Sequence, residues 1–295
     1  MLLSTQTDRV FKICGEDKGL KIFADAGYEA IDMSLFDMEY DDCKLNHIDI
    51  IEYAKELRKK AEALGLVFNQ AHAPFPCWKK DNDEYNKKII PYVKNAIKLA
   101  GTLGAKAIVV HPIAYTVQGD AQKEVNYKMY RDLAPVARDY GIKIALENMW
   151  GYDKRRNYII PNVCSYGKDL AEYYDDLNDP EIFTVCLDLG HCGLIGEEPE
   201  EAIYALGHDR IGALHIHDNN YVSDTHTLPL ELGSKMNWDK ITKALGEIDY
   251  KGDFTYEADN FLLRYDESNI HLGVKYMAEI GRMLMAKIDA ARPAK

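Results

Sequence analysis

Short apolar runs alternate with longer segments of helical periodicity along the whole chain. Runs that are apolar at nearly every position are typical of strands buried on both faces of a parallel sheet. Eight short runs that indicate buried strands occur, and several of them are nearly continuous in apolar residues, at residues 2–7, 30–35, 66–73, 107–113, 143–149, 183–189, 211–217 and 253–258. Eight segments with apolar residues at helical spacing alternate with them, at residues 19–27, 48–64, 84–103, 123–140, 168–177, 198–206, 238–248 and 270–288. The pattern therefore predicts eight β-α units.

Glycine and proline positions refine these predicted helices. Glycines closely follow four of them, as at helix ends that feed a strand, at Gly27, Gly65, Gly104 and Gly141. Pro91 and Pro135 lie within two of the predicted helices, where each should mark a helix start or a kink. Eight β-α units without a linker favour one domain over residues 1–295, a (β/α)8 TIM barrel of the α/β class. An open, doubly wound parallel sheet stays the alternative.

The composition is that of a globular, acidic protein. Of 295 residues, 47% are hydrophobic and 28% are charged, which excludes a disordered chain. With 36 Lys+Arg and 48 Asp+Glu the net charge is −12, which argues against tight nonspecific binding of nucleic acid. No stretch approaches the ~18 uncharged apolar residues of a membrane span, and the start is too polar for a signal peptide. The six cysteines form no Cys-x-x-Cys pair, so we expect reduced thiols in a cytoplasmic protein.

Residues of the metal-ligand type recur near the carboxyl ends of the third to eighth predicted strands. They are His72, His111, Glu147, Asp188 with His191, His215 with His217, and Glu257. In a barrel these strand ends converge on one rim, where the active site is built. A lone histidine there is more often a hydrogen-bonded rim residue, but six consecutive strands with such a residue favour a metal site. A mixed Asp, Glu and His set suits one divalent ion such as Mn, Co, Zn, Fe or Mg.

These motifs resemble the xylose isomerase-like TIM barrel superfamily, which includes sugar phosphate isomerases and epimerases and the endonuclease IV-type enzymes of AP endonuclease family 2. The matching segments are Ala71-His72-Ala73-Pro74, Val110-His111-Pro112, Leu146-Glu147-Asn148, Leu187-Asp188-Leu189-Gly190-His191, residues 206–211 and His215-Ile216-His217-Asp218-Asn219. The resemblance covers essentially the whole chain. The order of the motifs is specific for the superfamily and not for a substrate.

The sugar epimerase branch implies one divalent metal and two catalytic carboxylates. Its ligands correspond to Glu147, Asp188, His215 and Glu257. Glu147 and Glu257 are then also the catalytic acid and base. His217 points to the same side of the strand as His215, but His215 precedes the Ile-His-Asp-Asn turn as the family ligand does.

The endonuclease branch implies three zinc ions instead. It uses the same four residues together with His72, His111, His191, Asp224 and His226. Sugar-acting relatives keep these positions for binding substrate, so the resemblance implies a substrate-binding set of His72, His111, Asp153, His191, Asp224 and His226. We add Trp150, whose ring can pack on the apolar face of a sugar, and His217, which can polarise the substrate or relay protons. Three features depart from the epimerase pattern: Tyr221 stands where an arginine is expected, Asp153 replaces a glutamate, and residues 224–238 carry one extra residue.

The sequence thus predicts a metal-dependent isomerase or epimerase of a sugar, sugar phosphate or related polyol. A base removes a proton next to the carbonyl, and the metal stabilises the resulting enediolate. The alternatives are an inosose- or dehydroshikimate-type dehydratase on the same metal site, an endonuclease IV-like abasic-site nuclease, and a noncatalytic barrel. The expected partner is a small sugar or polyol; the net charge disfavours nucleic acid without excluding it, and no membrane partner is expected. The amphipathic last helix leaves a homo-oligomer open.

Overall fold

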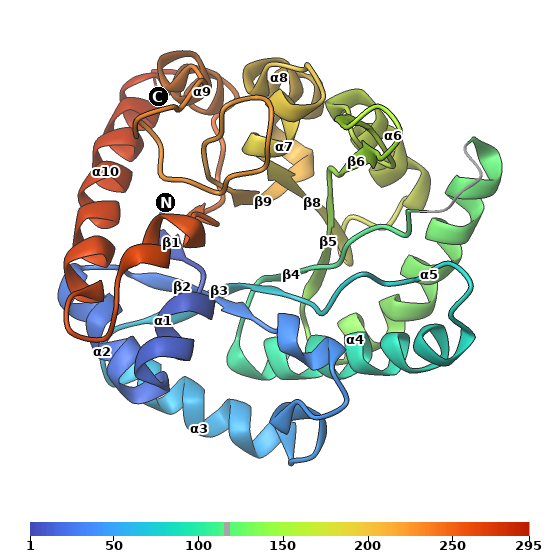
Figure 1. The fold of residues 1–295 in the computed structure, drawn as a ribbon, viewed down its shortest axis with the longest axis horizontal. Helices are drawn as coiled ribbons and strands as arrows, with labels where there is room; N and C mark the ends of the chain where they lie inside the picture. Colours follow the sequence, from blue (N-terminus) through green and yellow to red (C-terminus); the bar gives the residue numbers. More distant parts are fainter. Residues whose placement is uncertain (115–118, 295) are drawn as a thin grey trace.

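Eight parallel strands surround the centre of the molecule in this computed structural model, which describes residues 1–114 and 119–294 (Figure 1). The barrel strands are β1 (Leu3–Thr5), β2 (Ala30–Ser34), β3 (Val67–His72), β4 (Ala107–Val109), β5 (Lys143–Glu147), β8 (Phe183–Asp188), β9 (Ile211–His215) and β10 (Phe254–Tyr256). Each lies inside one of the eight runs expected from the sequence.

The ring of strands is closed by backbone pairing on both sides of β1 and β10. A six-stranded parallel sheet runs in the order β2-β3-β4-β5-β8-β9, and β1 pairs in parallel with β10. Two isolated parallel bridges, Gln6 with Asp32 and Ile216 with Tyr256, join this pair to the two edges of the sheet. Closure rules out the open sheet and confirms the (β/α)8 TIM barrel.

The helices cover the outside of this ring (Figure 1). They are α1 (Asp8–Cys14), α2 (Glu16–Ala26), α3 (Ile50–Glu62), α4 (Asp83–Leu103), α5 (Asp120–Asp139), α6 (Gly167–Leu177), α7 (Leu189–Leu194), α8 (Pro199–Arg210), α9 (Trp238–Glu247) and α10 (Ile270–Ala290). Short 3-10 turns are η1 (Phe36–Glu39), η2 (Lys44–Asn46) and η3 (Asp259–Arg264). No helix among the described residues is long and apolar enough to cross a lipid bilayer.

The glycines predicted at helix ends and the prolines predicted at helix starts or kinks differ in how well the structure agrees with them. Gly27 and Gly104 end α2 and α4 in the left-handed region, with φ of 82° and 89°, as expected of helix C-terminal glycines. Pro91 and Pro135, by contrast, begin neither helix, because α4 and α5 continue on both sides of them. Each proline removes one backbone hydrogen bond, but burial of a long apolar face over the whole helix outweighs that loss.

Besides α1, which lies outside the predicted helices, two features near the rim were not expected from the sequence. The loop after β5 forms an antiparallel hairpin of β6 (Trp150–Asp153) and β7 (Tyr158–Pro161). The helix α7 begins directly after β8, with no intervening loop. Both elements lie on the side of the barrel where the strands end, so they shape the entrance to the centre of the ring.

Alternation along the strands places small apolar side chains inside the barrel below its polar rim. A separate buried cluster consists of Ala107, Val109, Ala145, Cys186 and Ala213. Side chains on a strand return to the same face every second residue. The next inward positions after this cluster are therefore His111, Glu147, Asp188 and His215. The small side chains of this cluster leave room for charged groups nearer the carboxyl ends of the strands.

Candidate metal centre

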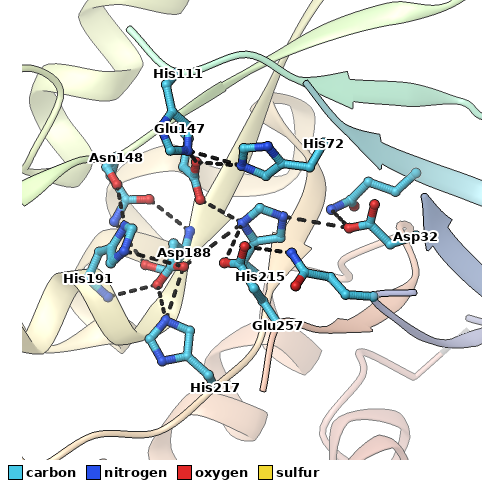
Figure 2. Close-up of polar contacts among 12 residues, drawn as sticks. Asp32, His72, His111, Glu147, Asn148, Asp188, His191, His215, His217 and Glu257 are labelled. Atoms are coloured by element: carbon cyan, nitrogen blue, oxygen red, sulfur yellow. Dashed lines mark hydrogen bonds and ion pairs between the residues drawn. The ribbon is translucent and has the colours of Figure 1, made fainter. Parts of the chain in front are cut away.

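Four of the sequence-predicted residues meet at the carboxyl end of the barrel (Figure 2). One ligand-type atom each from Glu147, Asp188, His215 and Glu257 lies within 4.8 Å of the others. Glu147, Asp188 and His215 are the last residues of β5, β8 and β9, and Glu257 directly follows β10. All four side chains are buried.

His215 lies between the carboxylates of this four-residue centre. Its Nδ1 atom is 2.6 Å from Glu147 Oε1 and 3.0 Å from Glu257 Oε2. Asp188 Oδ2 is 3.9 Å from the same nitrogen. Three carboxylates around one imidazole make an arrangement that repels itself unless protons or a cation compensate the charge.

A second group shares Glu147 and lies toward β3 and β4. His72, Glu147 and His215 present ligand-type atoms within 4.8 Å of one another. His111 Nε2 joins them, 2.8 Å from Glu147 Oε2 and 3.0 Å from His72 Nε2 (Figure 2). Glu147 can therefore present its two oxygens to two neighbouring groups.

A third group is formed by His191, His217, Asp224 and His226, again within 4.8 Å. Asp224 Oδ2 is 3.0 Å from His226 Nε2 and 3.4 Å from His191 Nε2. His217 Nε2 is 3.0 Å from Asp188 Oδ1, so this group adjoins the four-residue centre. The ring of His226 stacks on that of His217, with centroids 4.0 Å apart. The extra residue in 224–238 thus still leaves His226 at the rim.

The two remaining sequence-predicted residues, Trp150 and Asp153, lie on the hairpin. Trp150 Nε1 donates a hydrogen bond to Asp224 Oδ2 at 3.0 Å, which links the hairpin to the third group. Asp153 instead accepts hydrogen bonds from the backbone of Arg155 and Arg156 and pairs with the Arg156 guanidinium at 2.8 Å. The structure does not bring Asp153 into any of the three groups, and its role in substrate binding stays a prediction.

The charges of these groups compensate one another through imidazole protons. Burial opposes ionisation of Glu147, but the imidazoles of His215 and His111 hold its pKa well below the usual range. Burial also opposes protonation of His191, yet Asp188 and Asp224 raise its pKa to about 10. The pKa of His226 is raised to about 9 against the effect of burial, chiefly by Asp224 and Glu257. Imidazolium protons therefore occupy positions where a divalent cation would supply the positive charge.

Three polar residues of the first three strands support the centre and were not singled out from the sequence. Asp32 is fully buried, with Oδ2 3.8 Å from His215 Nε2 on the side away from Glu147 (Figure 2). Gln70 Nε2 donates to the same oxygen of Asp32 at 3.0 Å. Gln6 Nε2 donates to Glu257 Oε1 at 2.6 Å. Asp32 offered a signal in the sequence, a charged residue among Ala30, Ile31 and Met33 in a buried strand, whereas Gln6 and Gln70 lie among other polar residues.

Two glycines of α7 make room for side chains of the third group and its surroundings. A Cβ atom on Gly190 would lie 2.0 Å from Cε1 of His217. A Cβ atom on Gly193 would lie 2.2 Å from Cε1 of Tyr221. The Leu-Gly-His-Cys-Gly-Leu sequence of α7 is thus explained by close packing as well as by the position of His191.

Comparison with known proteins identifies the family. The sequence profile of the xylose isomerase-like TIM barrel matches residues 20–279. The chain belongs to this family. An uncharacterized protein of Methanocaldococcus jannaschii is 29% identical over 220 residues, which is 71% of this chain and 69% of the relative.

Two further relatives of this xylose isomerase-like barrel represent different chemistries. A probable endonuclease 4 of Mesoplasma florum is 26% identical over 137 residues, 44% of each chain. The crystal structure of a D-tagatose 3-epimerase-like protein superposes with a TM-score of 0.71 at 21% identity, covering 98% of this chain and 100% of the other. The structural likeness confirms the barrel fold.

Proposed function

We propose that this xylose isomerase-like barrel is a divalent-metal-dependent isomerase or epimerase of a sugar, sugar phosphate or related polyol. The observation that carries the proposal is the buried meeting of Glu147, Asp188, His215 and Glu257, with one ligand-type atom from each inside 4.8 Å. The epimerase-like structural neighbour, which matches nearly the full length of both chains, supports this reaction class.

The donor set of the four-residue centre fits a divalent cation. Three carboxylates and one imidazole are a mixed oxygen and nitrogen set of the kind that Mn, Co, Zn, Fe and Mg accept. Their negative charge is balanced in part by the proton of His215, whose pKa lies well above its usual range despite burial, because of the acidic groups around it. When bound, the cation would supply the positive charge that stabilises a negatively charged oxygen next to the reacting carbon.

Glu147 and Glu257 would perform the proton transfers. They approach His215 Nδ1 at 2.6 and 3.0 Å, so they flank the centre. Gln6 holds Oε1 of Glu257 and leaves Oε2 facing the centre, which fixes the direction in which this carboxylate can accept a proton. Glu147 has His111 at 2.8 Å, a group that can take up or return a proton. One carboxylate would remove the proton next to the carbonyl and the other would return one.

Metal stoichiometry of the purified protein tests this proposal first. We expect about one Mn, Co, Fe or Zn per chain by elemental analysis after dialysis without chelator. Turnover of members of a ketose and aldose panel should follow, with exchange of the proton next to the carbonyl in D2O. A protein that binds no metal and exchanges no sugar proton would contradict the proposal.

The Asp188→Asn variant identifies the ligand set in the same measurement. Replacing a carboxylate ligand by an amide removes one negative charge from the centre, so metal content should fall sharply. The exposed Asp37, which pairs with Lys12 at the surface, offers the matched control Asp37→Asn. Full metal occupancy in the Asp188 variant would show that the ligand set is wrong.

A nuclease for abasic DNA is the second candidate, because the ligand-type residues of the rim form three overlapping groups. Each group has at least three ligand-type side chains, and Glu147 and Asp188 link them. The relative named probable endonuclease 4 agrees with this possibility over 44% of the chain. The net charge of −12 opposes it, because nucleic-acid binding needs a basic face. Three zinc ions per chain together with abasic-site cleavage would favour the nuclease.

A further inference from the structure

A cleft of about 680 Å³ lies beside the third group of histidines, outside the four-residue centre. The hairpin forms one side of it with Trp150, Tyr152 and Tyr158, and the segment after β9 forms the other with Tyr221 and Asp224. The volume lies in the range of small-molecule sites, roughly 300–1,000 Å³. No function assigned above uses this space.

The cleft adjoins the third group through Asp224, which belongs to both, and Trp150, which contacts it. Asp224 lines the cleft, and its Oδ2 is also 3.0 Å from His226 Nε2 in the third group. Trp150 lines the cleft and donates to that same oxygen at 3.0 Å. A ligand in the cleft would therefore lie next to the third group, which adjoins the four-residue centre through His217 and Asp188.

The walls of the cleft are aromatic and nearly free of charge. Trp150, Tyr152, Tyr158 and Tyr221 supply four aromatic rings, and the side chains of Tyr152 and Tyr158 are 46% and 49% exposed. Among the described lining residues the single charged side chain is Asp224, an anion, and none is lysine or arginine. A phosphate would meet a carboxylate there and no cation, whereas the C–H face of a neutral sugar ring packs well on aromatic rings.

Several of these aromatic rings are held in place before a ligand arrives. Tyr221 packs on the bare backbone of Gly193, and its hydroxyl donates to Glu198 Oε2 at 3.1 Å. The Tyr152 hydroxyl donates across the hairpin turn to Asn157 Oδ1 at 2.5 Å. Fixed walls lower the entropic cost of binding, which is the property of a built subsite.

We propose that this cleft binds a neutral sugar ring joined by a glycosidic bond to the sugar that reacts at the metal centre. The substrate is then a disaccharide or another glycoside, and not a free or phosphorylated monosaccharide. This inference rests on the proposed function, since it names the substrate class of the same site.

Saturation-transfer NMR on the full chain supplemented with Mg²⁺, a diamagnetic ion that does not broaden the ligand signals, tests the subsite. The probes are cellobiose, maltose, glucose and glucose 6-phosphate. We expect at least one disaccharide to receive saturation on both rings and to bind about tenfold more tightly than glucose. Stronger binding of glucose 6-phosphate than of both disaccharides, or no disaccharide binding, would overturn the proposal.

Matched tyrosine variants assign the binding to the cleft. Tyr158→Ala and Tyr152→Ala should each weaken disaccharide binding by about tenfold. Tyr204, which is also 49% exposed but lies on α8, provides the control Tyr204→Ala, which should leave binding unchanged. Unchanged disaccharide binding in both cleft variants would overturn the subsite even if a disaccharide binds elsewhere.

Proton exchange in D2O separates failure of the subsite from failure of the proposed function. Exchange in free ketoses without disaccharide binding would remove the subsite and leave the isomerase or epimerase standing. Disaccharide binding that depends on Tyr158, with no exchange in any sugar, would remove the proposed reaction and leave the subsite standing.

Discussion

His215 is the residue around which the candidate centre is organised. Its Nδ1 faces Glu147 and Glu257, and its Nε2 faces Asp32 on the opposite side. A second carboxylate behind a histidine ligand orients the imidazole ring and selects which nitrogen carries the proton. Each carboxylate here acts through its contact with an imidazole. A substitution that keeps the size of the side chain and removes its charge therefore tests that contact without leaving a cavity.

The Glu257→Gln variant tests the proton-transfer role at the residue scale. An amide of the same size cannot accept a proton, so turnover should fall by at least about 10²-fold while the protein stays folded. Circular dichroism and the thermal unfolding midpoint serve as the check on folding. Activity close to that of the unchanged protein would remove Glu257 from the mechanism.

The Asp32→Asn variant tests the orientation of His215. Losing the carboxylate 3.8 Å from Nε2 should weaken metal binding by about 10–100-fold, the usual effect of removing a group that orients a ligand histidine. The dissociation constant measured by competition with a chelator reports this directly, without any activity assay. An unchanged constant would show that Asp32 serves only to bond Gln70.

At the element scale, the rim depends on how each strand passes into the segment after it. The strand β8 ends at Asp188, whose Oδ1 accepts a hydrogen bond from the backbone of His191 at 2.8 Å and so caps α7. One residue thus ends a strand, starts a helix and belongs to the centre. The helix α7 is short, and its glycines let it lie directly against His217 and Tyr221.

The Gly190→Ala variant tests this close packing. The added methyl group would lie 2.0 Å from His217 Cε1, so the ring must move, at a cost of about 1–3 kcal/mol of unfolding free energy. Chemical denaturation measures that cost. In a His217→Ala background the space is vacated, so the same substitution should cost much less. An equal cost in both backgrounds would place the strain elsewhere.

Elements with a regular pattern of buried apolar residues could be predicted from the sequence, whereas elements defined by turns were harder to predict. The eight barrel strands follow from short apolar runs, and eight of the ten α-helices among the described residues follow from the 3.6-residue period that a buried face enforces. The β6–β7 hairpin was missed because its residues are half exposed, so neither face imposes an apolar pattern. Its turn contains Asn157 at φ 58°, and an asparagine in the left-handed region is a recognised turn signal.

At the scale of the whole molecule, the barrel concentrates charge in its interior. Protonated histidines balance the carboxylates as long as no cation is bound, as the raised pKa values of His191 and His226 show. Metal ligands must lose such protons before they can bind. The stability of the metal-free protein is therefore tied to pH through the same groups that would hold a metal or contact a substrate.

Thermal unfolding of the metal-free protein should depend on pH in a defined direction. The pKa values of His191 and His226 rise from a usual ~6.5 to about 10 and about 9, so both bind protons more tightly when folded. The stability that their proton binding adds to the folded state, measured as free energy of unfolding, is fully present below pH ~6.5. It is lost as the pH rises through about 9 for His226 and about 10 for His191. The unfolding midpoint should therefore fall from neutral to alkaline pH.

A double variant and added metal provide the controls for this pH dependence. In the His191→Gln/His226→Gln protein the alkaline decline should be smaller, because the titrating groups are absent. Calorimetric titration with metal near neutral pH should release protons, seen as a heat that varies with the ionisation enthalpy of the buffer. An alkaline decline identical in both proteins would assign it to other groups.

The repeat of eight β-α units and the residue types at the strand ends can be derived from the amino-acid sequence alone. Both follow from local physics, because burial imposes a period on each element and chemistry limits which side chains can hold a metal or move a proton. The tertiary structure decided which of those side chains meet. Closure of the ring brings Asp32 against His215 and Gln6 against Glu257, and Gln70 bonds Asp32 from the neighbouring strand. Hairpin formation puts Trp150 on Asp224 and holds Asp153 in its own turn. Distances between residues remote in sequence depend on packing across the whole barrel, which no local pattern encodes.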